Sequence, residues 1–288
     1  MIGPLAYIGG KRRLAPLLIR LLPPHTTYVE PFAGGCQVFF RKPPSKVEVL
    51  NDLDNEVYNF LRVVQNHPNE LTRALTYAIA GRKLHGIFLR QNPDDLTEIQ
   101  RAARFLWLQK NSFAGRVSRQ NYHVCVSKPS NYNPITLPAR IEEAAKRLQR
   151  VQLECSSYES VLSRYDRTTT VFYIDPPYVG LKLYRFNFAN DQFLELADRL
   201  QRLKGKFILS INDCPTARTV FTMFNLWSTA VPYTATRAVR TVRELIITNY
   251  DPPHLDERTL RRETNFSEGG SQTKEPLCPP ALIPTTSP

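Results

Sequence analysis

One stretch of the chain joins a hydrophobic run to an acid, two prolines and an aromatic residue: Thr170-Val-Phe-Tyr-Ile-Asp-Pro-Pro-Tyr178. The β-branched and aromatic residues predict a buried strand over 170–174. Proline lacks a backbone N–H and fixes φ, so the Pro-Pro pair ends the strand in a stiff loop. The acid and the aromatic side chain are therefore expected at the end of a buried strand.

Strand patterns alternate with helical patterns on both sides of this stretch. Such alternation predicts a mainly parallel sheet with helices on both faces, a Rossmann-like α/β fold. The expected strands cover 27–30, 47–50, 151–154, 206–211 and, near the end, about 226–233 and 243–250. The expected helices cover 11–22, 55–66, 70–80, 141–150, 158–165, 191–203 and 215–224.

Two parts of the chain depart from this alternation. Residues 82–135 contain two helical patterns, 82–90 and 96–109, followed by a polar loop rich in Asn and Gly. We interpret them as a mostly helical subdomain inserted into a catalytic domain made of residues 1–81 and 136–250. Residues 251–288 are rich in Pro, Ser and Thr with few aromatics, which predicts a disordered tail.

The segment after the 170–174 strand has the groups needed to hold an exocyclic amine of a nucleobase. Asp175 can accept a hydrogen bond from the amine, and Pro176 offers a carbonyl without a competing N–H. Tyr178 offers a face on which a flipped base can stack. The alternative is that the prolines only end the strand. We expect that simpler role for the second copy, Asp251-Pro-Pro-His254, which lacks the aromatic.

A glycine turn follows the first predicted strand, in Val29-Glu-Pro-Phe-Ala-Gly-Gly35. Glycine permits φ > 0 and lets a ligand approach the backbone, as in nucleotide-binding α/β sheets. Asp52 ends the next strand, where an acid can accept hydrogen bonds from ribose hydroxyls. Asp52 could instead cap the next helix, but Asp54 is the better placed N-cap and leaves Asp52 for a ligand.

A third glycine turn lies near the amino terminus, in Tyr7-Ile-Gly-Gly-Lys11. A cofactor with a carboxylate and an adenine ring could use both the cation and the aromatic ring. The alternative is a loop that opens the first helix and leaves Lys11 on a solvated face.

The composition indicates a soluble intracellular protein with a polyanionic partner. The net charge is +12, and residues 1–250 carry +14 because the tail holds more acids than bases. The five cysteines show no paired spacing and the five histidines are scattered, so we expect no zinc cluster, no other metal site and no disulfide framework. No apolar stretch approaches the roughly 18 residues of a membrane span. A cytoplasmic protein is expected.

Taken together and in order, the motifs resemble the Dam-type (D12) family of DNA N6-adenine methyltransferases. The resemblance covers about residues 5–250 and includes three further segments, 105–115, 207–212 and 243–250. It implies a methyltransferase fold, S-adenosyl-L-methionine as cofactor, and double-stranded DNA as partner with the target adenine flipped out. Two positions depart from the family pattern. Cys36 replaces a further glycine or small residue, and Ala6 stands where relatives that methylate GATC commonly carry a lysine.

The resemblance also implies roles for single residues. The cofactor contacts would come from Tyr7, Lys11, Asp52 and Asp175, and its pocket would be shaped by Glu30, Phe32 and Gly34. The target adenine would be held by Asp175, Pro176 and Tyr178. The inserted segment would contact DNA through basic residues, with the flexible loop as the reader of sequence: Arg101, Arg104, Lys110, Arg116, Arg119 and Lys128.

Two other functions remain open at this stage. N4-cytosine and RNA-base methyltransferases share the acid-or-serine, Pro-Pro, aromatic arrangement, so this segment alone does not exclude them. A non-catalytic DNA-binding protein on the same fold is the alternative from a different class. The presence of Asp52, Asp175 and Tyr178 argues against it, because an inactive relative would be free to lose them.

Overall fold

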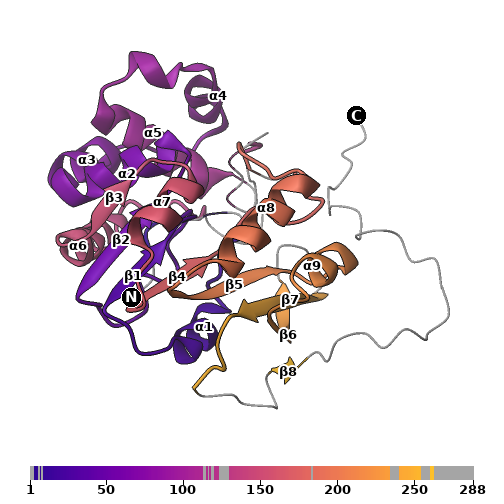
Figure 1. The fold of residues 1–288 in the computed structure, drawn as a ribbon. Coiled ribbons are helices and arrows are strands. Elements are labelled where there is room, and N and C mark those ends of the chain that lie inside the picture. Colours follow the sequence, from indigo (N-terminus) through magenta and orange to yellow (C-terminus); the bar gives the residue numbers. More distant parts are fainter. Residues whose placement is uncertain are drawn as a thin grey trace, which may run out of the picture.

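The computed structural model describes residues 3–5, 7, 9–112, 115, 117, 120–122, 130–182, 184–233, 240–253 and 260–262. Its centre is an eight-stranded sheet with the order β3-β2-β1-β4-β5-β7-β6-β8 (Figure 1). The first five strands in sequence run parallel to one another, and the last three pair antiparallel. The strands are β1 Thr27–Glu30, β2 Val47–Asn51, β3 Gln152–Glu154, β4 Thr170–Ile174, β5 Lys206–Asn212, β6 Asn225–Tyr233, β7 Arg240–Thr248 and β8 Arg261–Arg262.

Helices cover both faces of the sheet, so the predicted α/β fold is confirmed. Alternate residues of each strand point to opposite faces. In β4, Val171 and Tyr173 join one apolar cluster, whereas Phe172 and Ile174 join the other. The first cluster packs against α1 Ala15–Leu21, α2 Asn55–Asn66, α3 Pro68–Thr76, α5 Glu98–Asn111 and α6 Leu137–Leu148; the second packs against α7 Tyr158–Tyr165, α8 Asn190–Gln201 and α9 Pro215–Val220.

Proline positions correct two predicted helix starts. The chain turns between Lys11 and Leu14, and α1 begins only at Ala15, with a proline in its first turn. α6 begins at Leu137 rather than 141, again with a proline in the first turn. Proline suits this position because the first turn of a helix has no partner for the N–H that proline lacks.

The two described helices of the segment 82–135 pack against the main core. The segment contains α4 Arg82–Arg90 and α5; Figure 1 shows α5 beside α2 and α3, and α4 next to α5. Side chains of α5, with the fully buried Trp107 among them, lie in the same apolar cluster as β1 and β2. The amphipathic pattern predicted these helices correctly, but α5 completes the layer that covers one face of the sheet.

The described part of the predicted tail contains a short strand. After the Asp-Pro-Pro segment at 251–253, the chain returns to the sheet, where β8 pairs with β6 through Arg262 and Trp227. Leu260 is buried at 2% exposure in the larger cluster. A single leucine between charged residues has no periodic neighbours, and so it gave no strand signal. Within the described ranges, no helix is long and apolar enough to cross a membrane.

The order of the strands marks the place for a ligand. The chain passes from β1 outward to β2 and β3, and then returns to β4 on the other side of β1. Connections that leave in opposite directions open a crevice at the carboxyl ends of β1 and β4. Glu30 ends β1, and Asp175 directly follows β4.

Candidate active site

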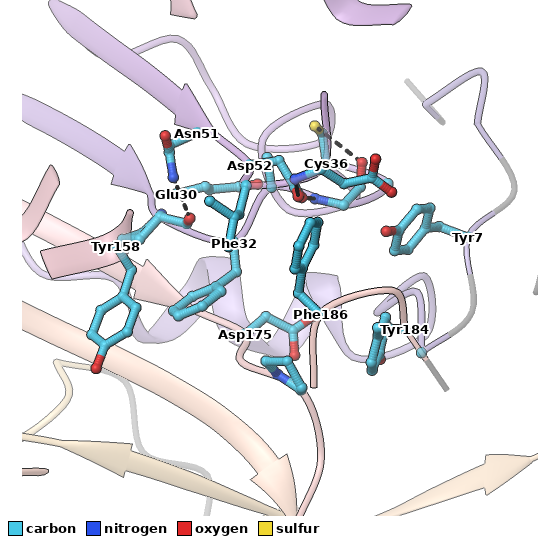
Figure 2. A pocket seen from close by; sticks show the side chains of 18 of the residues that line it. Tyr7, Glu30, Phe32, Cys36, Asn51, Asp52, Tyr158, Asp175, Tyr184 and Phe186 are labelled. Carbon is cyan, nitrogen blue, oxygen red and sulfur yellow. Dashed lines mark hydrogen bonds between the residues drawn. The ribbon is translucent and has the colours of Figure 1, made fainter. Parts of the chain in front are cut away.

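A cavity of about 200 Å³ lies at this crevice (Figure 2). Its walls come from the glycine turn after β1, the end of β2, the segment after β4 and the amino-terminal turn before α1. All seven residues predicted to contact or shape a cofactor line it: Tyr7, Lys11, Glu30, Phe32, Gly34, Asp52 and Asp175. The structure therefore brings together motifs that lie up to 168 positions apart in the sequence.

Asp52 ties the glycine turn to the end of β2. The backbone N–H of Gly34 donates to Asp52 Oδ2 at 2.8 Å, and the N–H of Asp54 donates to Oδ1 at 2.9 Å. Asp54 is the N-cap of α2 and accepts from the N–H of Glu56 at 3.0 Å, as predicted. Burial, with a contribution from the charge of Asp54, raises the pKa of Asp52 to about 6. Asp52 is thus not the helix cap and faces the cavity.

Cys36 takes a conformation that favours glycine. Its φ is 51°, in the left-handed region, and Gly34 in the same turn has a φ of 46°. The Cys36 side chain is 1% exposed and packs in the main apolar cluster. The departure from the family pattern is therefore accommodated by a small side chain that fills space inside the turn.

Glu30 is a buried carboxyl group on the cavity wall. Its Oε1 accepts from the Tyr28 hydroxyl at 2.6 Å and from the N–H of Phe39 at 2.9 Å. Burial raises the pKa of Glu30 to about 8, although both of these hydrogen bonds act in the opposite direction. Glu30 fixes the chain after the glycine turn against β1, which fits the predicted role of shaping the pocket.

Lys11 is buried at the floor of the site. Its ammonium donates to Asp175 Oδ1 at 2.6 Å, to the Tyr178 hydroxyl at 2.8 Å and to the Gly9 carbonyl at 3.4 Å. It also lies 4.6 Å from the centre of the Tyr178 ring. The alternative of a solvated lysine is therefore wrong. The turn at Gly9, whose φ is 71°, directs the chain so that Lys11 reaches the end of β4.

Asp175 sits between this lysine and the strands of the sheet. Besides Lys11, it accepts from the Ser210 hydroxyl of β5 at 3.5 Å. Burial raises the pKa of Asp175, and the charge of Lys11 acts against that rise. Pro176 is buried and Tyr178 is half-buried, and neither lines the cavity, whereas Pro177 does. The segment therefore lies beside the cavity, with Asp175 at the boundary.

A loop that the sequence analysis missed closes one side of the cavity. Tyr184 stacks on Tyr7 with 6.3 Å between ring centres, and Arg185 forms an ion pair with Asp54 at 3.0 Å. Phe186 lines the cavity although half of its surface is exposed, and Figure 2 shows its side chain beside Asp175. The interleaved aromatic and basic residues of Tyr184-Arg-Phe-Asn-Phe188, shortly after Asp-Pro-Pro-Tyr, are the signal that could have found it.

Glu244 of β7 is the second missed residue. It is 8% exposed, and its Oε1 accepts from the Tyr178 hydroxyl at 2.5 Å. It lies in the predicted strand 243–250, directly before the apolar run Leu245-Ile-Ile, and a charged residue at that position is the signal that could have found it.

The predicted DNA contacts fall into three groups. Arg116, Arg119 and Lys128 lie outside the described residues. Arg101 and Arg104 are turned inward and form ion pairs with the buried Glu56, so the structure does not favour them as DNA contacts. Lys110 is half-buried in the last turn of α5.

The charged groups that affect the pKa of Lys110 are all basic. Burial, followed by the charges of Arg140 and Arg12, lowers its pKa to about 8. Arg12 and Arg140 are exposed, and Arg12 accepts a hydrogen bond from Arg41 through its backbone carbonyl. In the part of the chain that the structure describes, Lys110 has no acidic partner. An anion beside it would relieve this repulsion.

Comparison with known proteins agrees with this geometry. The family model of D12 class N6 adenine-specific DNA methyltransferases matches residues 7–234. The chain belongs to this family. It is 28% identical to the type II methyltransferase M1.LlaDCHI of Lactococcus lactis subsp. cremoris over 85% of this chain and 94% of that protein. It is also 27% identical to the retron Ec67 DNA adenine methylase of Escherichia coli, over 76% of this chain and 80% of the relative.

Proposed function

We propose that the protein transfers a methyl group from S-adenosyl-L-methionine to N6 of an adenine flipped out of duplex DNA. The observation that carries this proposal is the Asp175–Lys11 pair at the crevice between β1 and β4, directly beside a cavity lined by the cofactor motifs. This arrangement places an acceptor for an amine next to a pocket for a nucleoside-like ligand.

The cavity suits a ligand with a nucleoside and a carboxylate. A Cβ added to Gly34 would lie 3.1 Å from the Tyr7 ring, so glycine at this position lets Tyr7 pack against the turn at the cavity. Asp52 can accept from ribose hydroxyls, since each carboxylate oxygen has a second lone pair. Phe32, Phe186 and Phe188 offer apolar surface for an adenine ring. When bound there, S-adenosyl-L-methionine would supply an electrophilic methyl group.

Asp175 and Pro176 would act on the target amine. The lone pair of N6 is delocalised into the adenine ring, which makes the amine a poor nucleophile. Two N–H donations, to the Asp175 carboxylate and to the Pro176 carbonyl, would favour a tetrahedral nitrogen whose lone pair points toward the methyl group. The main gain is in orientation. After transfer, the proton leaves N6 and binds to the Asp175 carboxylate, which restores a neutral amine.

Lys11 would hold Asp175 in the required position. The ammonium bonds one carboxylate oxygen, Oδ1, and thereby leaves Oδ2 for the amine. Because the pair is buried, its geometry does not depend on water that DNA binding would displace. Lys11 is thus expected to support catalysis through Asp175 as well as to contact the cofactor.

DNA binding would use the basic surface next to the site. Lys110 with Arg12 and Arg140 forms a cluster in which bound phosphate would relieve the mutual repulsion. The loop that carries Arg116, Arg119 and Lys128 remains our proposal for contacts that read the sequence. A base inside a duplex cannot reach a buried carboxylate, so the target must be flipped out at a cost of a few kcal/mol.

The test is to identify the modified base. The protein is incubated with unmethylated duplex DNA and methyl-labelled S-adenosyl-L-methionine, and the DNA is digested to nucleosides for mass analysis. We expect N6-methyladenine; N4-methylcytosine would contradict the proposal, and absence of label would point to a binding protein. Methylation-sensitive long-read sequencing of DNA from expressing cells then gives the sequence context.

A further inference from the structure

The hydrogen bonds around Asp175 continue beyond the segment that holds the target base. The chain of contacts runs from Asp175 through Lys11 and the Tyr178 hydroxyl to Glu244, at 2.6, 2.8 and 2.5 Å. It crosses from the loop after β4 to β7, a strand that contributes nothing to the wall of the cavity. Glu244 is therefore linked to the reacting groups without touching the pocket.

The direction of these hydrogen bonds is fixed by the number of protons available. An ammonium has three N–H donors, and Lys11 places them on Asp175, Tyr178 and Gly9. The Tyr178 hydroxyl has a single proton, so after accepting from Lys11 it donates to Glu244. Glu244 is thus the acceptor on which the position of the Tyr178 hydroxyl depends.

Two carboxylates share one cation in this network. The charged and titratable groups that face Glu244 are Lys11, Asp175, Tyr173 and Tyr178. Burial raises the pKa of Glu244, and the charge of Asp175 raises it further, against the effect of Lys11 and Tyr178. Its second oxygen, Oε2, is buried and has no hydrogen-bond partner. Because the two carboxylates repel each other, each makes the other more ready to take a proton.

We propose that Glu244 is a positioning residue for methyl transfer: it acts through the Tyr178 hydroxyl to hold Lys11 against Asp175, and its charge makes Asp175 a better acceptor of the N6 proton. The inference rests on the proposed function, because it assigns a role in that reaction. The proton balance needs no further reactant, since the proton moves from N6 to the Asp175 carboxylate. Tyr178 thereby gains a second task besides offering its ring to the base.

A double-mutant cycle tests the link. Single-turnover methyl transfer is measured for the wild type, Glu244→Gln, Tyr178→Phe and the double variant. Glu244→Gln replaces the charged acceptor by a neutral amide oxygen, and Tyr178→Phe removes the donor, so we expect each single variant to be slower by about 10- to 100-fold. If Glu244 acts through the hydroxyl, the double variant is faster than the product of the two single losses predicts, and the loss that remains beyond Tyr178→Phe is the direct effect of the Glu244 charge on Asp175. Effects that multiply would overturn the proposal.

The pH dependence separates positioning from a general loss of structure. Activity falls at low pH as Asp175 becomes protonated. Glu244→Gln removes the charge that favours this protonation. The acid limb, which is the fall in rate on the acidic side of the pH–rate profile, should therefore move to lower pH. The matched control is Glu48→Gln, another buried strand glutamate with a lysine partner, which is remote from Asp175 and should leave the limb in place. An acid limb that does not move in Glu244→Gln contradicts the proposal.

A measurement without cofactor or DNA completes the test. Because burial raises the pKa of Glu244, ionising it lowers the stability of the native state as the pH rises above the ordinary carboxyl range. Glu244→Gln should therefore gain in free energy of unfolding, relative to the wild type, as the pH rises. A difference that stays constant with pH would overturn the assignment. If Glu244→Gln does not fold, Glu244→Asp and Tyr178→Phe replace it, and both should slow transfer. If the wild type itself transfers no methyl group to DNA, the proposed function fails instead.

Discussion

The sequence Asp-Pro-Pro occurs twice, at 175–177 and 251–253, each time after a buried hydrophobic strand. β4 runs parallel to its neighbours, so Asp175 lies at the edge where the carboxyl ends of the parallel strands meet. β7 is antiparallel to β5 and pairs Thr248 with Ile208, so Asp251 lies at the opposite edge. The Asp175 side chain is 21% exposed and bonded to the buried Lys11, whereas that of Asp251 is 77% exposed. The same three residues become a site or a strand end according to the direction of the strand before them.

Replacing each aspartate by alanine should give the largest contrast. We expect Asp175→Ala to abolish methyl transfer while the protein stays folded, because no other group can accept from the target amine at that position. Asp251→Ala should leave the rate unchanged, since an exposed carboxylate with loose contacts contributes little. Methyl incorporation and circular dichroism of both variants check this. If Asp175→Ala transfers methyl groups within tenfold of the wild-type rate, Asp175 is not the essential acceptor and the predicted difference from Asp251 is wrong.

Lys11 is the partner that Asp251 lacks. Lys11→Met leaves Asp175 and Glu244 buried without their cation, and breaking a buried ion pair costs about 3–5 kcal/mol. Without Lys11, the pKa of each carboxyl group rises further, so both groups bind a proton at low pH and the uncompensated charge disappears. The loss in free energy of unfolding should therefore be smaller at low pH. Urea unfolding at pH 5 and pH 8 gives the comparison. An equal loss at both pH values would show that Lys11 stabilises the fold by packing alone.

Asp52 lies at the same edge of the sheet as Asp175, directly after β2. If it binds ribose hydroxyls, Asp52→Ala should weaken cofactor binding by about 1.5–3 kcal/mol, the scale of hydrogen bonds to a charged group. Titration calorimetry measures the dissociation constant. Asp54→Ala is the control, since it removes the cap of α2 and should lower thermal stability with a smaller effect on the cofactor. An unchanged dissociation constant in Asp52→Ala would make its role that of tying Gly34 to β2.

The segment after the second Asp-Pro-Pro is expected to matter for stability only. A chain that ends at Pro253 loses the buried Leu260, and burial of a leucine contributes about 1.5–3 kcal/mol. A chain that ends at Arg262 keeps this contact and should match the full-length protein. Both should methylate DNA at the wild-type rate below their melting temperatures. A slower rate in the shorter chain alone would connect β8 to the site.

Local patterns predicted the elements of the fold and most of the cavity wall. β4 and the Asp54 cap follow from side chains that interact with their own neighbours, and the structure confirms both. The cofactor motifs meet in one cavity because each follows a strand whose carboxyl end lies at the same edge. The expectations that agree with the structure are therefore those that rest on interactions between residues close together in the sequence.

What the sequence did not reveal depends on long-range contacts. Glu244 and Lys11 are separated by most of the chain, and no local pattern says that Tyr178 joins them. The helical period of α5 predicted a helix but not its partner, so its role in the main core was missed. Leu260 shows the same limit, because one apolar residue has no period. The contacts of each of these residues depend on which distant parts of the chain become neighbours in the fold.

The contacts that span the chain also set the time at which the site can exist during synthesis. Lys11 is made before its partner Asp175 by 164 residues, and Glu244 follows later still. Domains form as units once their distant parts are available, and elongation proceeds at about 5–20 residues per second. A nascent chain therefore carries Lys11 without its acidic partners for roughly 8–33 seconds and can act on DNA only after β7 has emerged. Activity of the growing chain begins with its last long strand.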